Sequence, residues 1–173
     1  NKILLIIQRS NGDVLLSQTL INELYAHYKS PKIDLLVNDD TLPVAKLLSN
    51  INFIHTFSYQ KKRENRWHQE KDIITSIFRK YDLSINLTAS DRSVLYVFFA
   101  SKNSMSAIEK DNKKSWWKKL LLTYHYFFDT TKHILLNNLE PLNYLNIKHK
   151  KTLGNPTFSE VATANVKNKL YKN

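Results

Sequence analysis

The sequence predicts an α/β fold with a Rossmann-like parallel sheet that carries helices on both faces. The first observation is the run Ile3–Ile7, which has no polar break, as expected for a strand buried on both faces of a parallel sheet. The second is that short apolar segments of this kind alternate along the chain with segments of helical apolar spacing. Alternating strands and helices are typical of a parallel sheet covered by helices on both faces.

The strands are expected at intervals that leave room for a helix between each pair. Their expected positions are residues 3–7, 31–37, 52–57, 81–87 and 105–108. The helices are expected at residues 13–28, 44–48, 73–78, 90–100, 131–144 and 158–171. Ser90 or Asp91 would cap the helix that begins there.

The turn after the first strand places a glycine and a carboxylate at the edge where parallel sheets bind ligands. Gly12 is one of two glycines in the chain, and its place between a strand and a helix predicts a positive φ or a close backbone approach. Asp13 has two compatible interpretations. As a helix cap it would accept backbone N–H bonds, and as a general base it would remove a proton from a ligand. The residues alone favour the cap.

The chain of 173 residues carries a formal net charge of +11, from 26 lysines and arginines against 15 aspartates and glutamates. Such an excess favours a polyanionic partner, which could be a nucleic acid, an anionic membrane surface or a phosphorylated substrate. Charge alone does not choose among these three partners.

Several kinds of site are excluded or not expected. The chain has no cysteine, which excludes disulfides and cysteine-ligated metals. Its histidines show no HExxH spacing, so no metal is expected, and neither a GxGxxG nor a P-loop pattern occurs. No apolar run approaches the length of roughly 18 residues that would predict a membrane span, and no secretory signal is recognised.

Three stretches, in order along the chain, resemble the bacterial lipopolysaccharide heptosyltransferases of glycosyltransferase family 9. The turn Ser10-Asn-Gly-Asp-Val-Leu15 matches their Ser-x-Gly-Asp-Val-Leu pattern. Residues 81–93 resemble Tyr-Asp-x-x-Ile-Asp-Leu-x-Gly-x-x-x-Ser, with Asn86 and Ala89 where an aspartate and a glycine are common. His133 begins a match to His-x-x-x-x-x-Leu-x-x-Leu. The resemblance covers residues 2–147 and departs from the family pattern at the two positions named.

The resemblance implies the N-terminal half of a GT-B glycosyltransferase that moves heptose from ADP-heptose to the lipopolysaccharide inner core. Residues 1–147 would be an acceptor-side domain, and residues 148–173 a linker or a C-terminal helical tail. The domain that binds the nucleotide-sugar would be absent from this chain, so the fragment alone is expected to be inactive. The aspartate of the turn is the proposed catalytic base in the family, and it maps onto Asp13. The reaction would be inverting and metal-independent, with no cofactor beyond the donor substrate.

The resemblance also implies that charged and polar residues near the ligand edge bind the acceptor. These residues are Gly12, Lys61, Lys62, Arg63, Arg66, Ser90, Asp91 and Arg92. Arginine holds carboxylates and phosphates in a bidentate fork, and lysine adds a point charge. The alternative for residues 61–68 is a solvated loop. For Asp91 and Arg92 the favoured alternative is an ion pair between them or a helix cap.

Adjacent tryptophans flanked by lysines at residues 113–122 suit a segment at a membrane interface. The residues expected to face the membrane are Trp116, Trp117, Lys118 and Lys119. The alternative is a core helix with lysines on its solvated side. The family acts at the cytoplasmic face of the inner membrane, so the resemblance implies a cytoplasmic, peripheral protein, and a monomer is expected.

The sequence therefore predicts the acceptor-binding domain of a glycosyltransferase. Its expected partners are a lipid-linked anionic oligosaccharide, a nucleotide-sugar and an anionic membrane surface, with no nucleic acid. Two rivals stay open, a basic non-catalytic α/β module that binds nucleic acid and an inactive glycosyltransferase homologue. The first rival explains the charge but gives no reason for Gly12 and Asp13 at the sheet edge.

Overall fold

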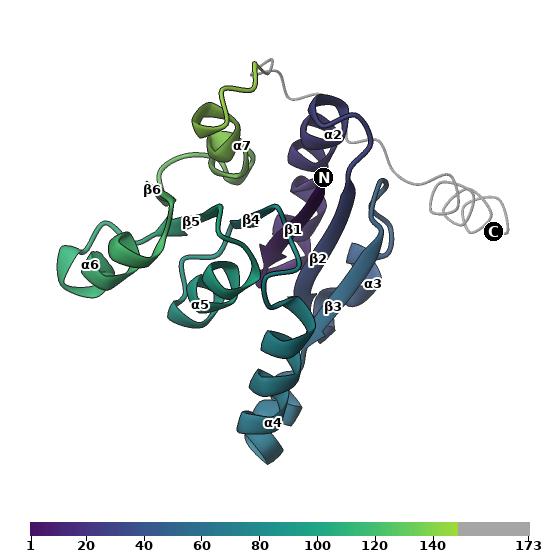
Figure 1. Cartoon of the computed structure of the whole chain (residues 1–173), viewed down its shortest axis with the longest axis vertical. Helices are drawn as coiled ribbons and strands as arrows, with labels where there is room; N and C mark the ends of the chain where they lie inside the picture. The colour runs from purple at the N-terminus through teal and green to yellow at the C-terminus, as the bar shows by residue number, and fades with distance from the viewer. Residues whose placement is uncertain (149–173) are drawn as a thin grey trace, which may run out of the picture.

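Six strands form one parallel sheet in the order β3-β2-β1-β4-β5-β6 in the computed structural model, which describes residues 1–148 (Figure 1). The strands are β1 (Lys2–Ile7), β2 (Lys32–Asn38), β3 (Phe53–Phe57), β4 (Leu83–Asn86), β5 (Ser104–Ile108) and β6 (Tyr124–Phe127). From β1 the chain adds β2 and β3 on one side of the sheet, and then returns to add β4, β5 and β6 on the other side. The topological switch point lies between β1 and β4. The predicted Rossmann-like fold class is confirmed.

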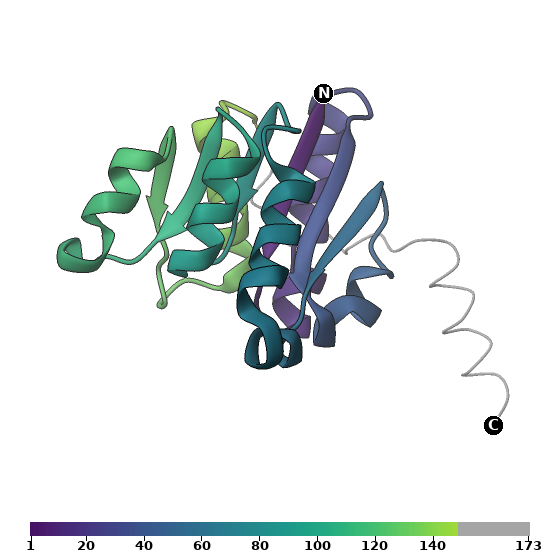
Figure 2. The same ribbon diagram turned by 60° about the horizontal axis from the view of Figure 1, so that its bottom comes forward.

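Helices cover both faces of the sheet. They are α1 (Asn11–Leu16), α2 (Gln18–His27), the 3-10 turn η1 (Asp39–Thr41), α3 (Leu42–Ala45), α4 (Tyr59–Ile77), α5 (Asp91–Ala100), α6 (Asn112–Leu121) and α7 (Ile134–Tyr144). In Figure 2 the teal helices α4 and α5 lie in front of the sheet, and the purple α2 and the lime-green α7 lie behind it. The tail predicted at 148–173 and the helix predicted at 158–171 lie outside the described residues, apart from Lys148.

Strand β1 supplies the centre of the core on both faces. Ile3, Leu5 and Ile7 pack into the cluster under α1, α2, α3 and α7, while Leu4 and Ile6 pack into the cluster under α4 and α5. These side chains are at most 1% exposed. Successive side chains of a strand point to opposite faces, and full burial of each aliphatic side chain contributes about 1.5–3 kcal/mol. The unbroken apolar run is therefore what a central strand requires.

The basic stretch that could have been a solvated loop is helical instead, because it forms the first half of α4. Ser58 caps the helix by accepting a hydrogen bond from the Lys61 amide, at 3.4 Å. The buried Gln69 side chain returns to the same residue, accepting from the Ser58 amide (2.7 Å) and donating to its carbonyl (2.9 Å). The helix kinks at Asn65, whose φ and ψ are −151° and 69°. This segment is therefore helical because of its N-cap and its hydrogen bonds to the residue after β3, and not because of an apolar face.

Strand β6 was not predicted. Its residues, Tyr124–Phe127, form the outer strand of the sheet, and only Tyr126 is buried. It pairs in parallel with β5, with Met105 opposite Tyr124 and Ile108 opposite Phe127. An edge strand with one buried side chain carries too little apolar alternation to be recognised from sequence.

The amino-terminal half of the sheet contains a buried polar network. It lies away from the carboxyl ends of the strands, which form the expected ligand edge. Asp34, which is 3% exposed, accepts from the Tyr81 hydroxyl (2.8 Å) and from Asn52 Nδ2 (2.7 Å). His55 Nε2 lies 3.0 Å from the same hydroxyl. Burial lowers the pKa of His55, and the positive charges of Lys2 and Lys80 lower it further, although the Asp34 carboxylate opposes them.

This network predicts a pH-dependent stability. Because the pKa of folded His55 lies below that of the unfolded chain, the unfolded state binds more protons, and stability falls as pH drops below about 6.5. We expect the free energy of unfolding to decrease between about pH 7.5 and 5.5, with a shallower slope in His55→Gln. Urea denaturation across that range measures the slope. Burial also lowers the pKa of His125, so both proteins should carry His125→Gln. Equal slopes would contradict the prediction.

Candidate functional site

The carboxyl ends of the central strands meet at one edge of the sheet, where open α/β sheets bind ligands. Register places Ile6 of β1 opposite Asn86 of β4, and Asn86 opposite Ser106 of β5. The Gln8 backbone N–H, just beyond β1, donates to the Thr88 hydroxyl beyond β4 at 3.0 Å. The turns that carry the predicted site residues therefore lie side by side, as their sequence positions predicted.

Asp13 is held by three contacts in the first turn of α1. Its Oδ2 accepts from the Ser10 amide (3.2 Å), the Ser10 hydroxyl (3.0 Å) and Arg9 Nε (3.0 Å). Ser10 is the N-cap and Asp13 the third helical residue of a reciprocal capping box. The side chain of Asp13 is 15% exposed. Since all three contacts from the described residues end on Oδ2, Oδ1 is the oxygen left for a ligand.

The turn around Asp13 differs from the prediction at Gly12. Gly12 has a helical place in α1, and no described glycine has a positive φ. A Cβ added there would meet only the Ser10 hydroxyl at 3.8 Å, an ordinary contact. Neither conformational freedom nor close approach within the described chain explains this glycine. The turn is instead braced by Arg9, whose guanidinium lies 4.4 Å from the centre of the Phe128 ring.

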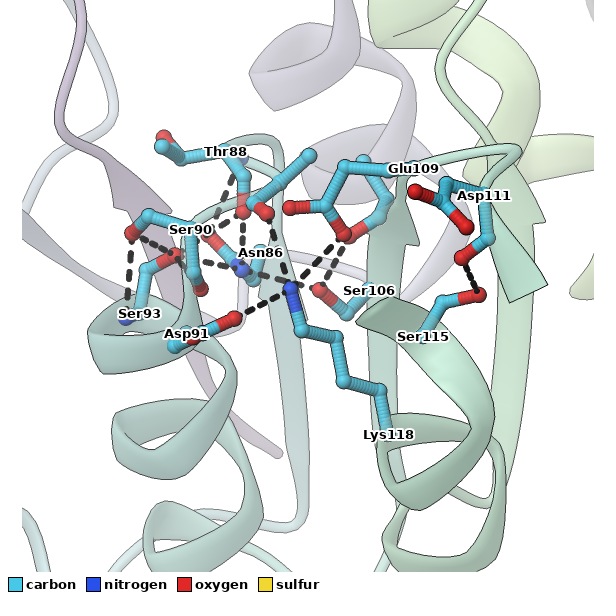
Figure 3. Close-up of polar contacts among 12 residues, drawn as sticks. Asn86, Thr88, Ser90, Asp91, Ser93, Ser106, Glu109, Asp111, Ser115 and Lys118 are labelled. Carbon is cyan, nitrogen blue, oxygen red and sulfur yellow. Dashed lines mark hydrogen bonds and ion pairs between the residues drawn. The ribbon is translucent and has the colours of Figure 1, made fainter. Parts of the chain in front are cut away.

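Asn86 organises the turn beyond β4. Its Nδ2 lies within hydrogen-bond distance of the Thr88 carbonyl (2.5 Å) and of the Ser93 (2.9 Å) and Ser106 (2.8 Å) hydroxyls (Figure 3). Its Oδ1 accepts from the Thr88 amide at 3.0 Å. An aspartate could accept from that amide but could not donate to the carbonyl. Asparagine, which replaces the family's common aspartate here, is therefore the residue that fits the surrounding donors and acceptors.

The start of α5 separates the three residues predicted there. Ser90 is the N-cap and accepts from the Ser93 amide at 3.3 Å, as one of the predictions had it. Asp91 pairs with Lys118 at 2.6 Å, not with Arg92. The Arg92 guanidinium lies instead 3.7 Å from the centre of the Phe57 ring, at the end of β3. The predicted ion pair between Asp91 and Arg92 is therefore wrong, although both side chains lie at the ligand edge.

Lys118 was predicted to face a membrane, and this is wrong. Its side chain has no exposed surface, and its ammonium group contacts Asp91 (2.6 Å), Glu109 (2.7 Å) and the Ala89 carbonyl (3.2 Å). Figure 3 shows it reaching from α6 towards the turns beyond β4 and β5. A lysine can be buried only where partners replace its hydration. Its position could not be read from a lysine-rich segment.

The remaining tryptophans and lysine of that segment divide between core and surface. Trp117 is half-buried against the core under α4 and α5, whereas Trp116 is 60% exposed. Leu120, one turn beyond Trp116, is 76% exposed. Lys119 is partly exposed and donates to Asn112 Oδ1 at 2.8 Å. Helix α6 therefore combines a buried side, as expected of a core helix, with an exposed apolar pair.

The four predicted acceptor-binding cations of the basic stretch lie in the first half of α4, beyond β3. Lys61, Arg63 and Arg66 are exposed, and Lys62 is partly exposed. Lys61 lines a pocket of about 210 Å³ at the kink, together with Asn65 and His68. No described contact joins these cations to Asp13 or to Asp91. They form an exposed basic surface rather than a built site.

Sequence reasoning missed two polar residues at this edge. Gln8, which follows β1, is 7% exposed, and Asn38, the last residue of the neighbouring strand β2, is 5% exposed. The side-chain atoms Gln8 Nε2 and Oε1 and Asn38 Oδ1 are buried without a hydrogen-bond partner. A polar residue at the end of an apolar strand was the available signal, and it was assigned to a turn.

The six parallel strands and the helices on both faces define a Rossmann-like domain. Among solved structures, the chain is similar to E. coli heptosyltransferase WaaC with ADP-2-deoxy-2-fluoro heptose, with a TM-score of 0.74 at 15% identity, covering 89% of this chain and 51% of that one. It is also similar to E. coli ADP-heptose lps heptosyltransferase II, with a TM-score of 0.68 at 19% identity, covering 98% and 50%. At these identities the likeness shows the fold.

Sequence comparison connects the chain to the same enzymes. It is 29% identical over 105 residues to lipopolysaccharide heptosyltransferase 3 of Escherichia coli, a match that covers 60% of this chain and 30% of that protein. It is 33% identical over 84 residues to the protein of that name in strain K12, covering 46% and 24%. No family model matches. The resemblance to the lipopolysaccharide heptosyltransferase family is thereby confirmed, and the chain spans only part of these relatives.

Lys118 is buried, whereas its two carboxylate partners are accessible to solvent. Removing the two negative charges should therefore cost more stability than removing the lysine. Asp91→Asn with Glu109→Gln leaves a buried ammonium without a counter-charge, which should destabilise the domain by about 3 kcal/mol or more. Lys118→Met keeps the volume and leaves two carboxylates that solvent can hydrate, since their side chains are 73% and 37% exposed. We expect that variant to lie within about 1.5 kcal/mol of the parent. Urea denaturation gives both values.

The more exposed pair between Lys132 and Glu140, whose nitrogen and oxygen lie 3.0 Å apart, provides the control. Glu140→Gln should change stability by less than about 1 kcal/mol, because exposed ion pairs contribute little. The prediction would be contradicted if Lys118→Met lost more free energy of unfolding than the double variant. That result would show that the charge of Lys118 stabilises the domain and is not merely a buried charge that needs neutralising.

Proposed function

We propose that this chain supplies the acceptor-side domain of a glycosyltransferase that moves heptose from ADP-heptose to the inner core of lipopolysaccharide. The observation that carries the proposal is Asp13. It lies at the ligand edge beyond β1, in the turn that resembles the heptosyltransferase motif, with one carboxylate oxygen engaged and the other left for a ligand. The family similarity of the sequence supports the same reaction class.

In the proposed reaction Asp13 acts as general base. Its Oδ1 would take the proton of an acceptor hydroxyl as that oxygen attacks the anomeric carbon of the donor. The bond from that carbon to the diphosphate breaks, and ADP leaves from the opposite face, with inversion. Arg9 and Ser10 would hold the carboxylate through Oδ2 and fix its orientation. A positioned base contributes about 10²–10⁴-fold to the rate. Residues 1–148 contain no group of three or more histidine, aspartate or glutamate side chains that could hold a metal ion, and the proposal routes no step through one.

The donor is proposed to be a nucleotide-sugar held mainly by a second domain. The solved structure with an ADP-heptose analogue supports that choice of donor for the relative. Residues 1–173 alone are then expected to transfer no sugar. Positioning of the acceptor against the donor would supply much of the catalysis.

The acceptor is proposed to be an anionic oligosaccharide linked to lipid. Lys61, Lys62, Arg63 and Arg66 on α4 would contact its carboxylates and phosphates, with Arg92 nearer to the sheet. Ser90 and Asp91 would serve indirectly, since one caps α5 and the other pairs with Lys118. Arginine geometry suits both anions.

Attachment to an anionic membrane surface, at the cytoplasmic face of the inner membrane and as a monomer, is part of the proposal. No helix among residues 1–148 is long and apolar enough to cross a membrane. Trp116 and Leu120 are instead exposed one turn apart on α6, and Lys113, Lys114 and Lys119 belong to the same helix. Indole and aliphatic groups beside lysines suit the boundary between lipid headgroups and acyl chains.

Asp13→Asn tests the catalytic role in the active protein that contains this sequence. We expect kcat to fall by about 10²–10⁴-fold, because the amide cannot take the proton. Loss of the charge beside Arg9 and in the capping box should cost roughly 0.5–2 kcal/mol of stability. Steady-state kinetics with thermal denaturation measure the two effects separately.

Ser10→Ala is the matched control, since it removes the capping hydroxyl but leaves the Asp13 carboxylate. It should lose comparable stability and a much smaller part of the rate, because Arg9 Nε and the Ser10 backbone N–H still hold Oδ2. A rate loss in Ser10→Ala equal to that in Asp13→Asn would reduce Asp13 to a capping residue.

Binding separates the acceptor role from the nucleic-acid rival. Core oligosaccharide and generic RNA are titrated into residues 1–173 at two salt concentrations. Nucleic-acid binding falls steeply with salt and tracks total charge. Tight RNA binding together with no oligosaccharide binding would favour the rival.

Trp116→Ala with Leu120→Ala tests the membrane surface. We expect binding to vesicles of equal phosphatidylglycerol and phosphatidylcholine to weaken by roughly tenfold or more, because both side chains would leave the interface. Co-sedimentation of residues 1–173 measures this. Trp67, which is 79% exposed on α4, gives the control Trp67→Ala, which should bind like the parent. Equal weakening in both variants would remove α6 as the attachment surface.

A further inference from the structure

Buried polar atoms without partners gather at the ligand edge. Five side-chain nitrogen or oxygen atoms in residues 1–148 are buried and have no hydrogen-bond partner. Four of them belong to three residues there: Gln8 Nε2 and Oε1, Asn38 Oδ1 and Arg92 Nε. The fifth, Asn138 Nδ2, lies on α7. Native proteins pair nearly all such atoms, so a group of four at one edge requires an explanation.

The three residues lie on one face of the sheet. Leu4 and Ile6 of β1 pack under α4 and α5, and alternation places Gln8 on that face as well. In β2, Leu36 packs there too, which places Asn38 on the same face. Register pairs Ile7 with Val37, so Gln8 comes beside Asn38.

Arg92, in the first turn of α5, is the third member of this group. Asn38 is the Cα partner of Phe57 in β3. The Arg92 guanidinium lies 3.7 Å from the centre of that Phe57 ring and 5.6 Å from the centre of the Tyr59 ring. Gln8 and Asn38 are buried, while Arg92 is partly exposed. Arg92 is therefore the member of the group that reaches the surface.

The unpartnered atoms specify the chemistry of a ligand. Gln8 Oε1 and Asn38 Oδ1 are acceptors and need donors, whereas Gln8 Nε2 and Arg92 Nε are donors and need acceptors. A fully ionised phosphate or carboxylate offers only acceptors, and a metal ion offers no acceptor at all. Hydroxyl groups both donate and accept. Adjacent hydroxyls of a sugar could therefore satisfy both kinds of atom, and the Phe57 and Tyr59 rings provide apolar surface beside them.

We propose that Gln8, Asn38 and Arg92 form a subsite for the hydroxyls of a sugar ring in the acceptor, with Arg92 at the surface of the subsite. The inference rests on the proposed acceptor-binding function and adds to it the recognition of neutral hydroxyls. The cations on α4 respond to the charge of the acceptor. The subsite responds to its hydroxyl pattern and does not need its phosphates.

The test uses residues 1–173 and a core oligosaccharide ending in heptose, in phosphorylated and dephosphorylated forms. Gln8→Leu with Asn38→Leu removes the unpartnered amides at similar volume. We expect affinity by isothermal titration to fall at least tenfold for both forms of the oligosaccharide, with no decrease in melting temperature. Arg63→Gln with Arg66→Gln should weaken binding of the phosphorylated form more than that of the dephosphorylated form.

Two further variants keep the test decisive. Asn138→Leu removes the remaining unpartnered amide away from the edge, and its affinity should equal that of the parent. Arg92→Met removes the donor at the surface of the subsite, so it gives the answer if the double variant fails to fold. It too should bind both oligosaccharides at least tenfold more weakly.

The outcomes separate the two proposals. Parent-like binding of both oligosaccharides by the folded Gln8→Leu, Asn38→Leu variant would overturn the subsite alone and assign the buried amides to internal water. Parent-like binding by Arg92→Met would likewise overturn the subsite if the double variant does not fold. Failure of the folded parent to bind either oligosaccharide would overturn the acceptor function, and the subsite with it.

Discussion

The burial of β1 on both faces is the constraint on which the ligand edge depends. Ile3, Leu5 and Ile7 commit the strand to one layer of helices, and Leu4 and Ile6 commit it to the other. A shift of one residue in register would exchange the two sets, so the position of the strand is strongly specified. The end of the strand is thereby fixed, and with it Gln8 and the turn that holds Asp13.

Polar contacts then fix the turns beyond β4 and β5 relative to the end of β1. The Gln8 backbone N–H donates to the Thr88 hydroxyl, and the Asn86 side chain contacts Thr88, Ser93 and Ser106. Lys118 draws the turns beyond β4 and β5 together through Asp91 and Glu109. Each link satisfies a polar group that burial would otherwise leave costly, so the turns are set by local chemistry as well as by the sheet.

The fold could be predicted because its central strands are apolar and its connections follow helical spacing. The parts that could not be predicted are those stabilised by polar contacts rather than by an apolar pattern. The first half of α4 depends on Ser58 and Gln69, and β6 buries little besides Tyr126.

The same limit applies to the site residues. Asp13 became a candidate because its turn resembles a known motif. The structure corrects its predicted capping role, because Ser10 is the N-cap and Asp13 is the third residue of the capping box. Lys118 was misplaced because a sequence does not show which lysine of a basic segment meets two carboxylates. Gln8 and Asn38 were missed because their unpaired atoms appear only once the strands are paired.

The net charge of +11 therefore divides into cations with different roles. Arg9 and Lys118 are committed to carboxylates, and Arg92 lies over Phe57. The exposed cations of α4 are screened by salt and contribute little fixed geometry, although they attract anions over a distance. In the proposed function, attraction of the anionic acceptor and discrimination among acceptors would thus depend on different residues. Discrimination must come from groups whose positions the sheet fixes, because only those lose free energy when a ligand fails to match their donors and acceptors.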